Sequence, residues 1–418
     1  MAAEYEGEGK ERKMITIRDV KTIVTAPRGI ELVVVKVETS EPGLYGLGCA
    51  TFTQRWSAVV TAVNDYLKPL VIGKKVNDIN DLWQLMMSYS YWRNGPVLNN
   101  AISGIDQALW DIKGKIAGLP VYELLGGKAR EAVTPYRHAD GPNWEAVEKR
   151  IQQYLDEGYR HIRVHCNTYG GNMNVRDGNG MAIKKPEGAP DGSYFDPAQY
   201  MRDTVALIAH MREKFGYEVE FLHDIHERLS PVQSLQLAKD LEPYKLFFLE
   251  DALPPEQVEW FEYLRNHTCV PLAMGELFNN VMEFKSIIAN RYIDYIRCHV
   301  SQLGGLTPAV RLAHFCDVFG VKTAWHGPAD TSPIGITAEL HLDLVSPNFG
   351  IQEYSDFSEE ERIVFPGCPT VRDGYVYVND GPGWGVDLNE EEAAKYPPSI
   401  KENTWLKCRL PDGTCVRA

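Results

Sequence analysis

Apolar and polar positions follow two different patterns along the chain, and the change between them predicts a domain boundary. From Met14 to Glu38 the two kinds alternate and then give way to a valine-rich run, which is typical of β-strands. Three later segments carry apolar residues at helical spacing instead: 57–70, 78–91 and 99–117. Strands followed by helices indicate an α+β domain, which we place at 14–130 behind a polar leader at 1–13.

The middle of the chain repeats another unit, a short apolar run followed by an amphipathic segment. Eight such runs end in a polar residue: His138, Arg163, Asp224, Glu250, Glu276, His299, His326 and Glu353. All but one of the intervals between them measure 23 to 27 residues, the period of one strand and one helix in a parallel sheet. Periodicity alone fits a barrel or a large open sheet, but eight units within roughly 225 residues favour a barrel, placed at 131–360.

One interval is much longer, with 61 residues between Arg163 and Asp224. It holds about 35 residues beyond a usual strand–helix unit, and they are rich in Gly, Asn, Asp and Pro. A disordered surface insertion fits this composition about equally well. Because the segment directly follows a strand end, where barrel enzymes carry specificity loops, we predict a lid at about 167–199.

Three consecutive strand ends carry one carboxylate each: Asp224, Glu250 and Glu276. In a barrel these ends meet at one edge, where three carboxylates repel one another unless a cation neutralises them. Three unrelated acidic strand ends are the simpler alternative, but the even spacing favours a shared site. Oxygen ligands without cysteine favour Mg²⁺.

A histidine and an arginine flank the predicted metal site. His226 lies two residues after Asp224 and is expected on the same side of an extended chain, whereas His223 and Glu227 are expected to point elsewhere. Arg163 suits binding of a carboxylate, although its high pKa makes it a poor base. His326 precedes a Gly-Pro turn, where a histidine can exchange protons or only hydrogen-bond the loop.

The amino-acid composition then limits the classes of binding partner and the cellular compartment. The 418 residues include 43 Lys and Arg against 57 Asp and Glu, a net charge of −14, which argues against nucleic-acid binding. No apolar run is long enough to span a membrane, and the polar N-terminus lacks the apolar core of a signal peptide. None of the eight cysteines forms a CxxC pair. These features predict a cytoplasmic protein with free thiols and no membrane partner.

Taken together, these residues resemble the enolase superfamily, and within it the mannonate dehydratase-like branch of sugar-acid dehydratases. The motifs that carry the resemblance include Tyr91-Trp92-Arg93, Ala108-Leu109-Trp110-Asp111-Ile112-Lys113, Leu222-His223-Asp224-Ile225-His226, Leu249-Glu250-Asp251, Gly275-Glu276-Leu277-Phe278-Asn279 and His326-Gly327-Pro328. The resemblance implies a (β/α)7β barrel. It also implies an α+β capping domain that the N-terminal segment forms with a C-terminal tail, 361–418.

The resemblance also implies a chemistry. Asp224, Glu250 and Glu276 would bind one Mg²⁺ per subunit, which coordinates an acid sugar and stabilises the enediolate formed when the C2 proton leaves. His226 would protonate the departing 3-hydroxyl to give a 2-keto-3-deoxy acid, and Arg163 would work with a lid tyrosine on the C2 proton. Further residues would hold the substrate: His138, His326, Asp330, Glu353 and Arg297. A homo-oligomer is implied too.

The sequence departs from this pattern around an intact metal site. The position of the lid tyrosine falls at Val175, which leaves Tyr169 as the candidate base and His165 as its substitute. Thr53 replaces an Asn, Pro328 stands where efficient mannonate dehydratases tend to carry Ala, and the closing tryptophan is absent.

We therefore expect a hydro-lyase with low activity on an aldonate of the D-mannonate or D-gluconate type. Two alternatives stay open. One is dehydration or epimerisation of another acid sugar, and the other is a divergent member with a binding or regulatory role.

Overall fold

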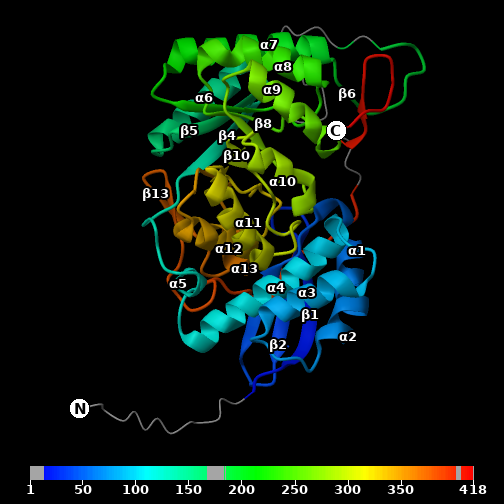
Figure 1. Ribbon diagram of the computed structural model, residues 1–418, viewed down its shortest axis with the longest axis vertical. Helices are drawn as coiled ribbons and strands as arrows, with labels where there is room; N and C mark the ends of the chain where they lie inside the picture. The colour runs from blue at the N-terminus through cyan, green and yellow to red at the C-terminus, as the bar shows by residue number, and fades with distance from the viewer. Residues whose placement is uncertain (1–13, 167–182, 184, 402–405, 418) are drawn as a thin grey trace.

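The computed structural model describes residues 14–166, 183, 185–401 and 406–417 (Figure 1). The chain begins with an antiparallel sheet of three strands: β1 (Ile17–Thr25), β2 (Leu32–Thr39) and β3 (Tyr45–Cys49). Successive residues of β2 pack into two different hydrophobic cores. Val33 and Val35 pack among the cap helices, whereas Val34 belongs to the core that the cap shares with the barrel. Because both faces of β2 are covered, the strand is almost continuously apolar.

Helices cover one face of this sheet. They are α1 (Trp56–Thr61), a π-helical stretch at Ala62–Leu67, α2 (Lys68–Val71), α3 (Ile79–Tyr89) and α4 (Pro96–Ala117). The single helix predicted for 57–70 is therefore interrupted by π geometry. Gly46 and Gly48 let β3 approach α4 closely, because a Cβ at either position would lie 2.0 Å from a carbonyl oxygen of α4.

The barrel consists of eight parallel strands. They are β4 (Pro135–Gly141), β5 (His161–Cys166), β7 (Glu220–Asp224), β8 (Phe248–Glu250), β9 (Leu272–Met274), β10 (Tyr295–Ile296), β11 (Lys322–Thr323) and β12 (Gln352–Glu353). Their order in the sheet is β11-β10-β9-β8-β7-β5-β4-β12. A parallel bridge between Thr323 and Phe349, with a hydrogen bond of 2.9 Å from the Gly350 amide to the Thr323 carbonyl, links the two ends of the sheet.

Seven helices connect these strands and surround the sheet. They are α6 (Trp144–Asp156), α7 (Pro197–Phe215), α8 (Pro231–Leu241), α9 (Phe261–His267), α10 (Val281–Ala289), α11 (Leu306–Phe319) and α12 (Pro333–Val345). The (β/α)7β architecture implied by the resemblance is confirmed, as is the parallel sheet predicted from the periodicity. Because α7 begins at Pro197, the last residues of the predicted lid belong to this helix.

A layer of apolar side chains lies directly below the polar strand ends. Tyr136, Leu222, Phe248 and Ile351 are buried in one cluster, and each lies two residues before a polar strand end. Side chains two residues apart share a face of a strand. The apolar layer and the polar residues above it therefore occupy the same face of the sheet.

The C-terminal tail crosses the cap and then continues to the barrel. Helix α13 (Glu359–Val364) leads into it, and β13 (Thr370–Arg372), β14 (Tyr375–Tyr377) and α14 (Glu390–Ala393) follow. Trp384 donates to the Leu47 carbonyl at 3.0 Å, and Ala26 donates to the Tyr396 carbonyl at 2.9 Å, which ties the tail to the cap sheet. Beyond the cap, β15 (Cys408–Arg409) pairs with β6 (Ser193–Tyr194) of the long insertion (Figure 1). The tail thus does more than return to the cap, because its last part lies against the insertion.

Two further expectations concern the described residues. None of the helices there combines the length and the apolarity that a membrane crossing needs. All eight cysteines carry free thiols. The domain limits at 130 and 360 stay predictions.

Candidate functional site

The three predicted metal ligands come together at the carboxyl ends of neighbouring strands. Asp224 ends β7 and is in register with Glu250 at the end of β8, and Glu276 follows β9 by two residues. One carboxylate oxygen from each lies within 4.8 Å of the other two. The even spacing in the sequence thus corresponds to a compact cluster of oxygen donors.

The charge of this cluster is only partly neutralised by protein groups. Burial raises the pKa of Glu250 and of Glu276 well above the usual glutamate value, and the charge of Asp224 adds to both shifts. Arg163 Nη1 lies 3.1 Å from Asp224 Oδ2. A close set of oxygen donors without sulfur or nitrogen suits a hard divalent cation, which would offset this repulsion. The three residues therefore fit Mg²⁺.

A second group of charges lies beside the triad, around the fully buried side chain of Arg297. Its Nη1 is 2.8 Å from Glu250 Oε1, and its Nη2 is 2.6 Å from Glu353 Oε2 and 2.5 Å from the Tyr136 hydroxyl. Arg297 is 0% exposed and is not among the residues that line the pocket. Its position supports bracing of two carboxylates rather than the substrate contact that was predicted.

Glu353 joins this buried group to the pocket surface. His138 Nε2 lies 2.8 Å from Glu353 Oε1, and the Gly327 amide donates to Glu353 Oε2 at 3.2 Å. Burial would raise the pKa of the Glu353 carboxyl, but His326, Arg297 and His138 outweigh it and hold that pKa well below its usual value. Glu353 is therefore an ionised acceptor that can fix the protons of its neighbours.

His326 packs between Glu276 and the buried His299. Its Nε2 is 3.2 Å from Glu276 Oε2, and its Nδ1 is 3.1 Å from His299 Nδ1. Burial lowers the pKa of His326 well below its ordinary value. A neutral imidazole is thus expected here, able to donate from one ring nitrogen and accept at the other.

His226 and Glu227 both line the pocket, which corrects one expectation. The His226 amide donates to Asp224 Oδ1 at 2.6 Å, and His226 Nε2 is 3.5 Å from Glu276 Oε1. Glu227 was expected to point elsewhere by strand alternation. Both residues have positive φ, 56° and 61°, so the chain leaves the extended conformation after Asp224 and the alternation ends there.

Glu227 is consequently a buried acid in the site. Its amide donates to the Asp251 carbonyl at 2.8 Å, and its side chain is 4% exposed. Burial, followed by the charges of Glu276 and Asp224, raises the pKa of Glu227 to about 9. The group is therefore protonated at neutral pH while Mg²⁺ is absent.

Several of these residues form one wall of a pocket of about 930 Å³; they are Asp224, His226, Glu227, Glu276, His326 and Glu353. The cap closes it from the other side with Phe52, Gln54 and Arg55, and Leu406 and Arg417 of the tail also reach its surface. Thr53 Oγ1 donates to Asp330 Oδ2 at 3.0 Å, which joins the cap to a predicted substrate residue. The volume is within the range of small-molecule sites.

Of the remaining predicted residues, some line the pocket and one has a structural position. His138, Arg163, His326, Asp330 and Glu353 line the pocket. His223 is structural as expected, since its ring nitrogens lie 2.8 Å from the Tyr200 hydroxyl and 2.9 Å from the Val164 carbonyl oxygen.

Neither candidate for the C2 base gains support. His165, the substitute, is stacked on His223, and burial lowers its pKa to about 3, so it is a weak base. Tyr169 and Val175 lie outside the described residues.

Sequence reasoning missed the wall residues that come from other elements. Asp140 lies two residues after His138 on β4, and the alternation of a strand could have identified it. Gln54, Arg55, Leu406 and Arg417 reach the pocket only through the packing of the cap and the tail, and no local pattern marks them.

Comparisons with known proteins agree with this architecture. Residues 146–393 match the family described as enolase C-terminal domain-like, and residues 11–126 match the mandelate racemase / muconate lactonizing enzyme N-terminal domain. A protein of Enterocloster bolteae, named a D-galactonate dehydratase family member, is 62% identical over 403 residues, covering 96% of this chain and 99% of the relative.

Two matches come from Pantoea ananatis. The D-galactonate dehydratase family member RspA is 54% identical over 411 residues, with 96% of this chain and 99% of the relative covered. The crystal structure of an enolase with bound D-gluconate and Mg is 52% identical with a TM-score of 0.92, covering 97% of this chain and 100% of the other.

Proposed function

Because the chain belongs to the D-galactonate dehydratase family of the enolase superfamily, we propose that it is a magnesium-dependent acid-sugar dehydratase. Its substrate would be an aldonate of the D-gluconate or D-mannonate type, and its product a 2-keto-3-deoxy acid. D-gluconate and Mg bound to the related Pantoea protein support this choice of ligands. We expect the activity to be low, given the departures at Thr53 and Pro328.

One observation carries the proposal: a three-carboxylate cluster with a histidine at its edge. Asp224, Glu250 and Glu276 lie within 4.8 Å through their oxygens, and His226 Nε2 is 3.5 Å from Glu276 Oε1. A protein without catalytic or binding use has little reason to keep such costly buried charges together.

Asp224, Glu250 and Glu276 would hold the ion, which when bound stabilises the negative charge that develops on the substrate carboxylate as the C2 proton leaves. The protein groups around it bind, orient and move protons. Arg163 adds a fixed positive charge at the site through its contact with Asp224. Together with the ion and the histidines, this charge would let a chain of net charge −14 accommodate an anion.

His226 would act as the general acid. Its side chain is 17% exposed at the pocket surface, and its backbone is held by the bond to Asp224. A proton at its Nε2 could pass to the departing 3-hydroxyl, which turns a poor leaving group into water. Tyr169 stays our candidate for removal of the C2 proton, with Arg163 as its partner.

The polar residues on the opposite strands would hold the hydroxyl groups of the sugar. His138 and Glu353 form a linked pair whose separation is 2.8 Å, so the carboxylate fixes which ring nitrogen of His138 carries a proton. His326 and Asp330 line the same surface and offer further donors and acceptors. Such a set favours a polyhydroxylated acid over an apolar one.

The experiment uses purified protein, Mg²⁺ and a panel of aldonates in D₂O, followed by NMR and by a colorimetric test for 2-keto acids. Formation of a 2-keto-3-deoxy acid from D-gluconate or D-mannonate is the expected result. Deuterium at C2 without loss of water would support an epimerase. No exchange with any acid would favour the second alternative, a binding or regulatory role, and would remove both enzymatic proposals for that panel.

A matched variant shows whether the measured activity comes from this protein or from a contaminating enzyme. His226→Asn keeps a polar side chain at the position and should lose dehydration while still binding Mg²⁺. Equal rates for this variant and the unchanged protein would rule out His226 as the acid.

We also propose a cytoplasmic homo-oligomer. The eight free cysteines support a reducing compartment. Sedimentation velocity of the purified protein tests the oligomer, and a monomer at micromolar concentration would contradict it.

A further inference from the structure

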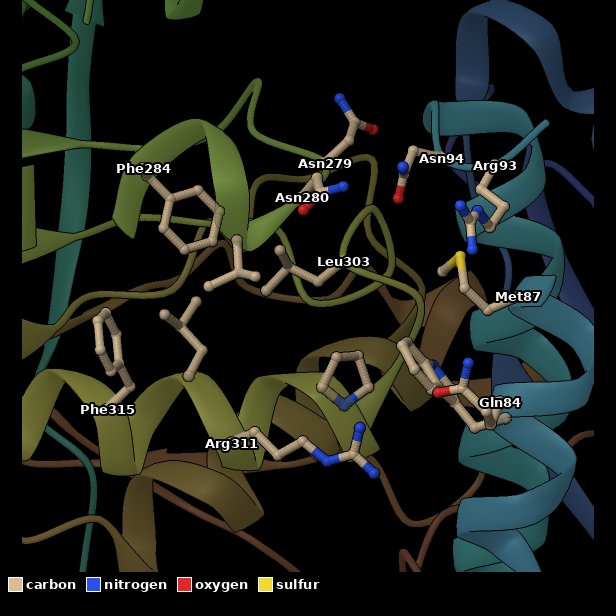
Figure 2. Close-up of a pocket in the computed structure, with 14 residues that line it drawn as sticks. Gln84, Met87, Arg93, Asn94, Asn279, Asn280, Phe284, Leu303, Arg311 and Phe315 are labelled. Carbon is tan, nitrogen blue, oxygen red and sulfur yellow. The ribbon is translucent and has the colours of Figure 1, made fainter. Parts of the chain in front are cut away.

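A second cavity lies at the junction between the cap and the barrel, next to the pocket already described, with which it shares the lining residue Asn279. It measures about 520 Å³ and lies between α3 with the turn after it on one side and α10 and α11 on the other. Figure 2 shows Met87, Arg93 and Asn94 on the cap side and Asn280, Leu303 and Phe315 on the barrel side of the same open space. Domain junctions are a frequent position for small-molecule sites.

Part of the wall of this cavity is apolar. Phe284, Leu303 and Leu312 are buried barrel residues, and Met87 of α3 faces them from the cap. An aromatic or branched hydrocarbon group of modest size would find contacts here on both sides. The volume is within the 300–1,000 Å³ that is typical of small-molecule pockets.

The charged residues of the cavity all have one sign. Arg93 and Arg311 are lining residues, and among the described residues no carboxylate lines the cavity. This contrasts with the whole chain, in which acidic residues outnumber Lys and Arg by 57 to 43. Charge complementarity therefore points to an anion.

Arg311 is held in place before any ligand arrives. Its Nη2 donates to Asn80 Oδ1 at 2.8 Å, and its guanidinium lies 5.2 Å from the centre of the Trp83 ring. Trp83 is itself fixed by a hydrogen bond of 2.9 Å to the Gly304 carbonyl. A cation ordered in this way loses little entropy when it binds a carboxylate. Arg93 belongs to the Tyr91-Trp92-Arg93 motif, for which the active-site pocket has no use.

From these features we infer that the cavity is a binding site for a small amphipathic carboxylate. The hydrocarbon part would lie against Phe284 and Leu303, and the carboxylate would lie between Arg93 and Arg311. The amide side chains of the wall can bond a polar group of such a ligand; they belong to Gln84, Asn94, Asn279 and Asn280. The charged lining residues distinguish this site from the active-site pocket, because the pocket is lined by carboxylates such as Asp224 and Glu276 and the described lining of the cavity has none.

The test is a fluorescence titration with 8-anilinonaphthalene-1-sulfonate, an aromatic anion, followed by displacement with 3-phenylpropionate. The titration is run with EDTA so that no metal in the active-site pocket can bind the acid. Displacement by 3-phenylpropionate but not by the neutral 3-phenylpropan-1-ol is expected. The Arg93→Gln/Arg311→Gln double variant should bind at least about fivefold more weakly.

A matched control variant and a crystal structure that locates the bound ligand complete the experiment. Lys285→Gln removes one charge from the exposed face of α10 without touching the cavity and should bind as the unchanged protein does. In a crystal soaked with 3-(4-iodophenyl)propionate, the anomalous iodine signal should lie between Phe284 and Leu303.

Several results would overturn the inference. They are equal affinity of the double variant, equal displacement by the neutral alcohol, or iodine density elsewhere. Trp92, next to Arg93, is 83% exposed, so a second copy of the chain is the competing occupant. A self-associated protein that binds neither probe would assign the cavity to that contact and refute the ligand site.

Discussion

Replacing Arg297 with methionine removes a cation that lies between two buried carboxylates. The unchanged side chain is 0% exposed and contacts Glu250 at 2.8 Å and Glu353 at 2.6 Å. Methionine keeps much of the length and none of the charge. If Arg297 braces these carboxylates, as its burial indicates, the variant should be less stable. If it contacts substrate instead, stability should hold and KM should rise.

The expected loss follows from the cost of an unpaired buried charge. Breaking a buried ion pair by removing one partner lowers stability by about 3–5 kcal/mol. Here one guanidinium is paired with two carboxylates. Proton uptake limits the loss, because the carboxylates can protonate instead of remaining charged. We therefore expect the free energy of unfolding to fall by about 3–5 kcal/mol at neutral pH.

The pH dependence of this loss has a definite sign. The folded-state pKa of Glu353 is held well below its usual value, partly by Arg297. A depressed carboxyl pKa contributes stability above the unfolded value of about 4.3, and the contribution disappears as the pH falls through the folded pKa. The deficit of the variant should therefore be largest at neutral pH and shrink below about pH 4.

Urea unfolding, followed by tryptophan fluorescence and far-UV circular dichroism, measures the effect. Arg18→Met is the matched control, because Arg18 pairs with Glu38 at 2.5 Å on the surface and is 63% exposed. Exposed pairs contribute about 0–1 kcal/mol, so the control should barely move the transition. A loss for Arg297→Met no larger than for the control would refute the bracing role, and a raised KM with unchanged stability would establish substrate contact.

Three further predictions concern the site. Glu250→Gln should weaken Mg²⁺ binding, measured by calorimetry, by more than the roughly 10- to 100-fold that is typical when a residue next to a metal ligand is changed. The exposed Glu359→Gln serves as the control. Unchanged Mg²⁺ affinity of Glu250→Gln would mean that the triad is not the metal site. His226→Asn should lower kcat by about 10²–10⁴ with Mg²⁺ affinity intact, and loss of both together would indicate a structural role. In metal-free protein Glu227→Gln should stabilise the fold by up to about 3 kcal/mol at pH 7 and by little near pH 4. The reason is that the pKa of Glu227 is raised in the folded protein, which loses stability as the pH rises from the unfolded pKa to the folded pKa. A stability difference that does not depend on pH would contradict the raised pKa.

Much of the metal site could be predicted because local periodicity records it. The strand–helix unit places Asp224, Glu250 and Glu276 at successive strand ends, and parallel strands must end at one edge of the sheet. The apolar residue two positions before Asp224 or Glu250 is equally local, since alternation along a strand sets the face. These features need only neighbouring residues, so the sequence contains them.

Other features depended on conformations that the pattern does not record. Glu227 enters the pocket because two consecutive residues adopt positive φ, which strand alternation cannot anticipate. Arg297 lies two residues before the predicted strand end His299, and its long side chain carries the guanidinium to two carboxylates. The direction of a long side chain is decided by the charges around it, and those come from other strands.

By itself, the sequence determined the series of parallel strands and helices and the position of the acidic cluster, because both follow from a repeat of about 26 residues. Only the tertiary structure decided what closes the pocket. Thr53 meets Asp330 across 277 residues of chain, and Leu406 and Arg417 reach the pocket from the tail. Contacts between segments so far apart depend on how two surfaces pack, and neither surface alone carries a pattern that specifies its partner.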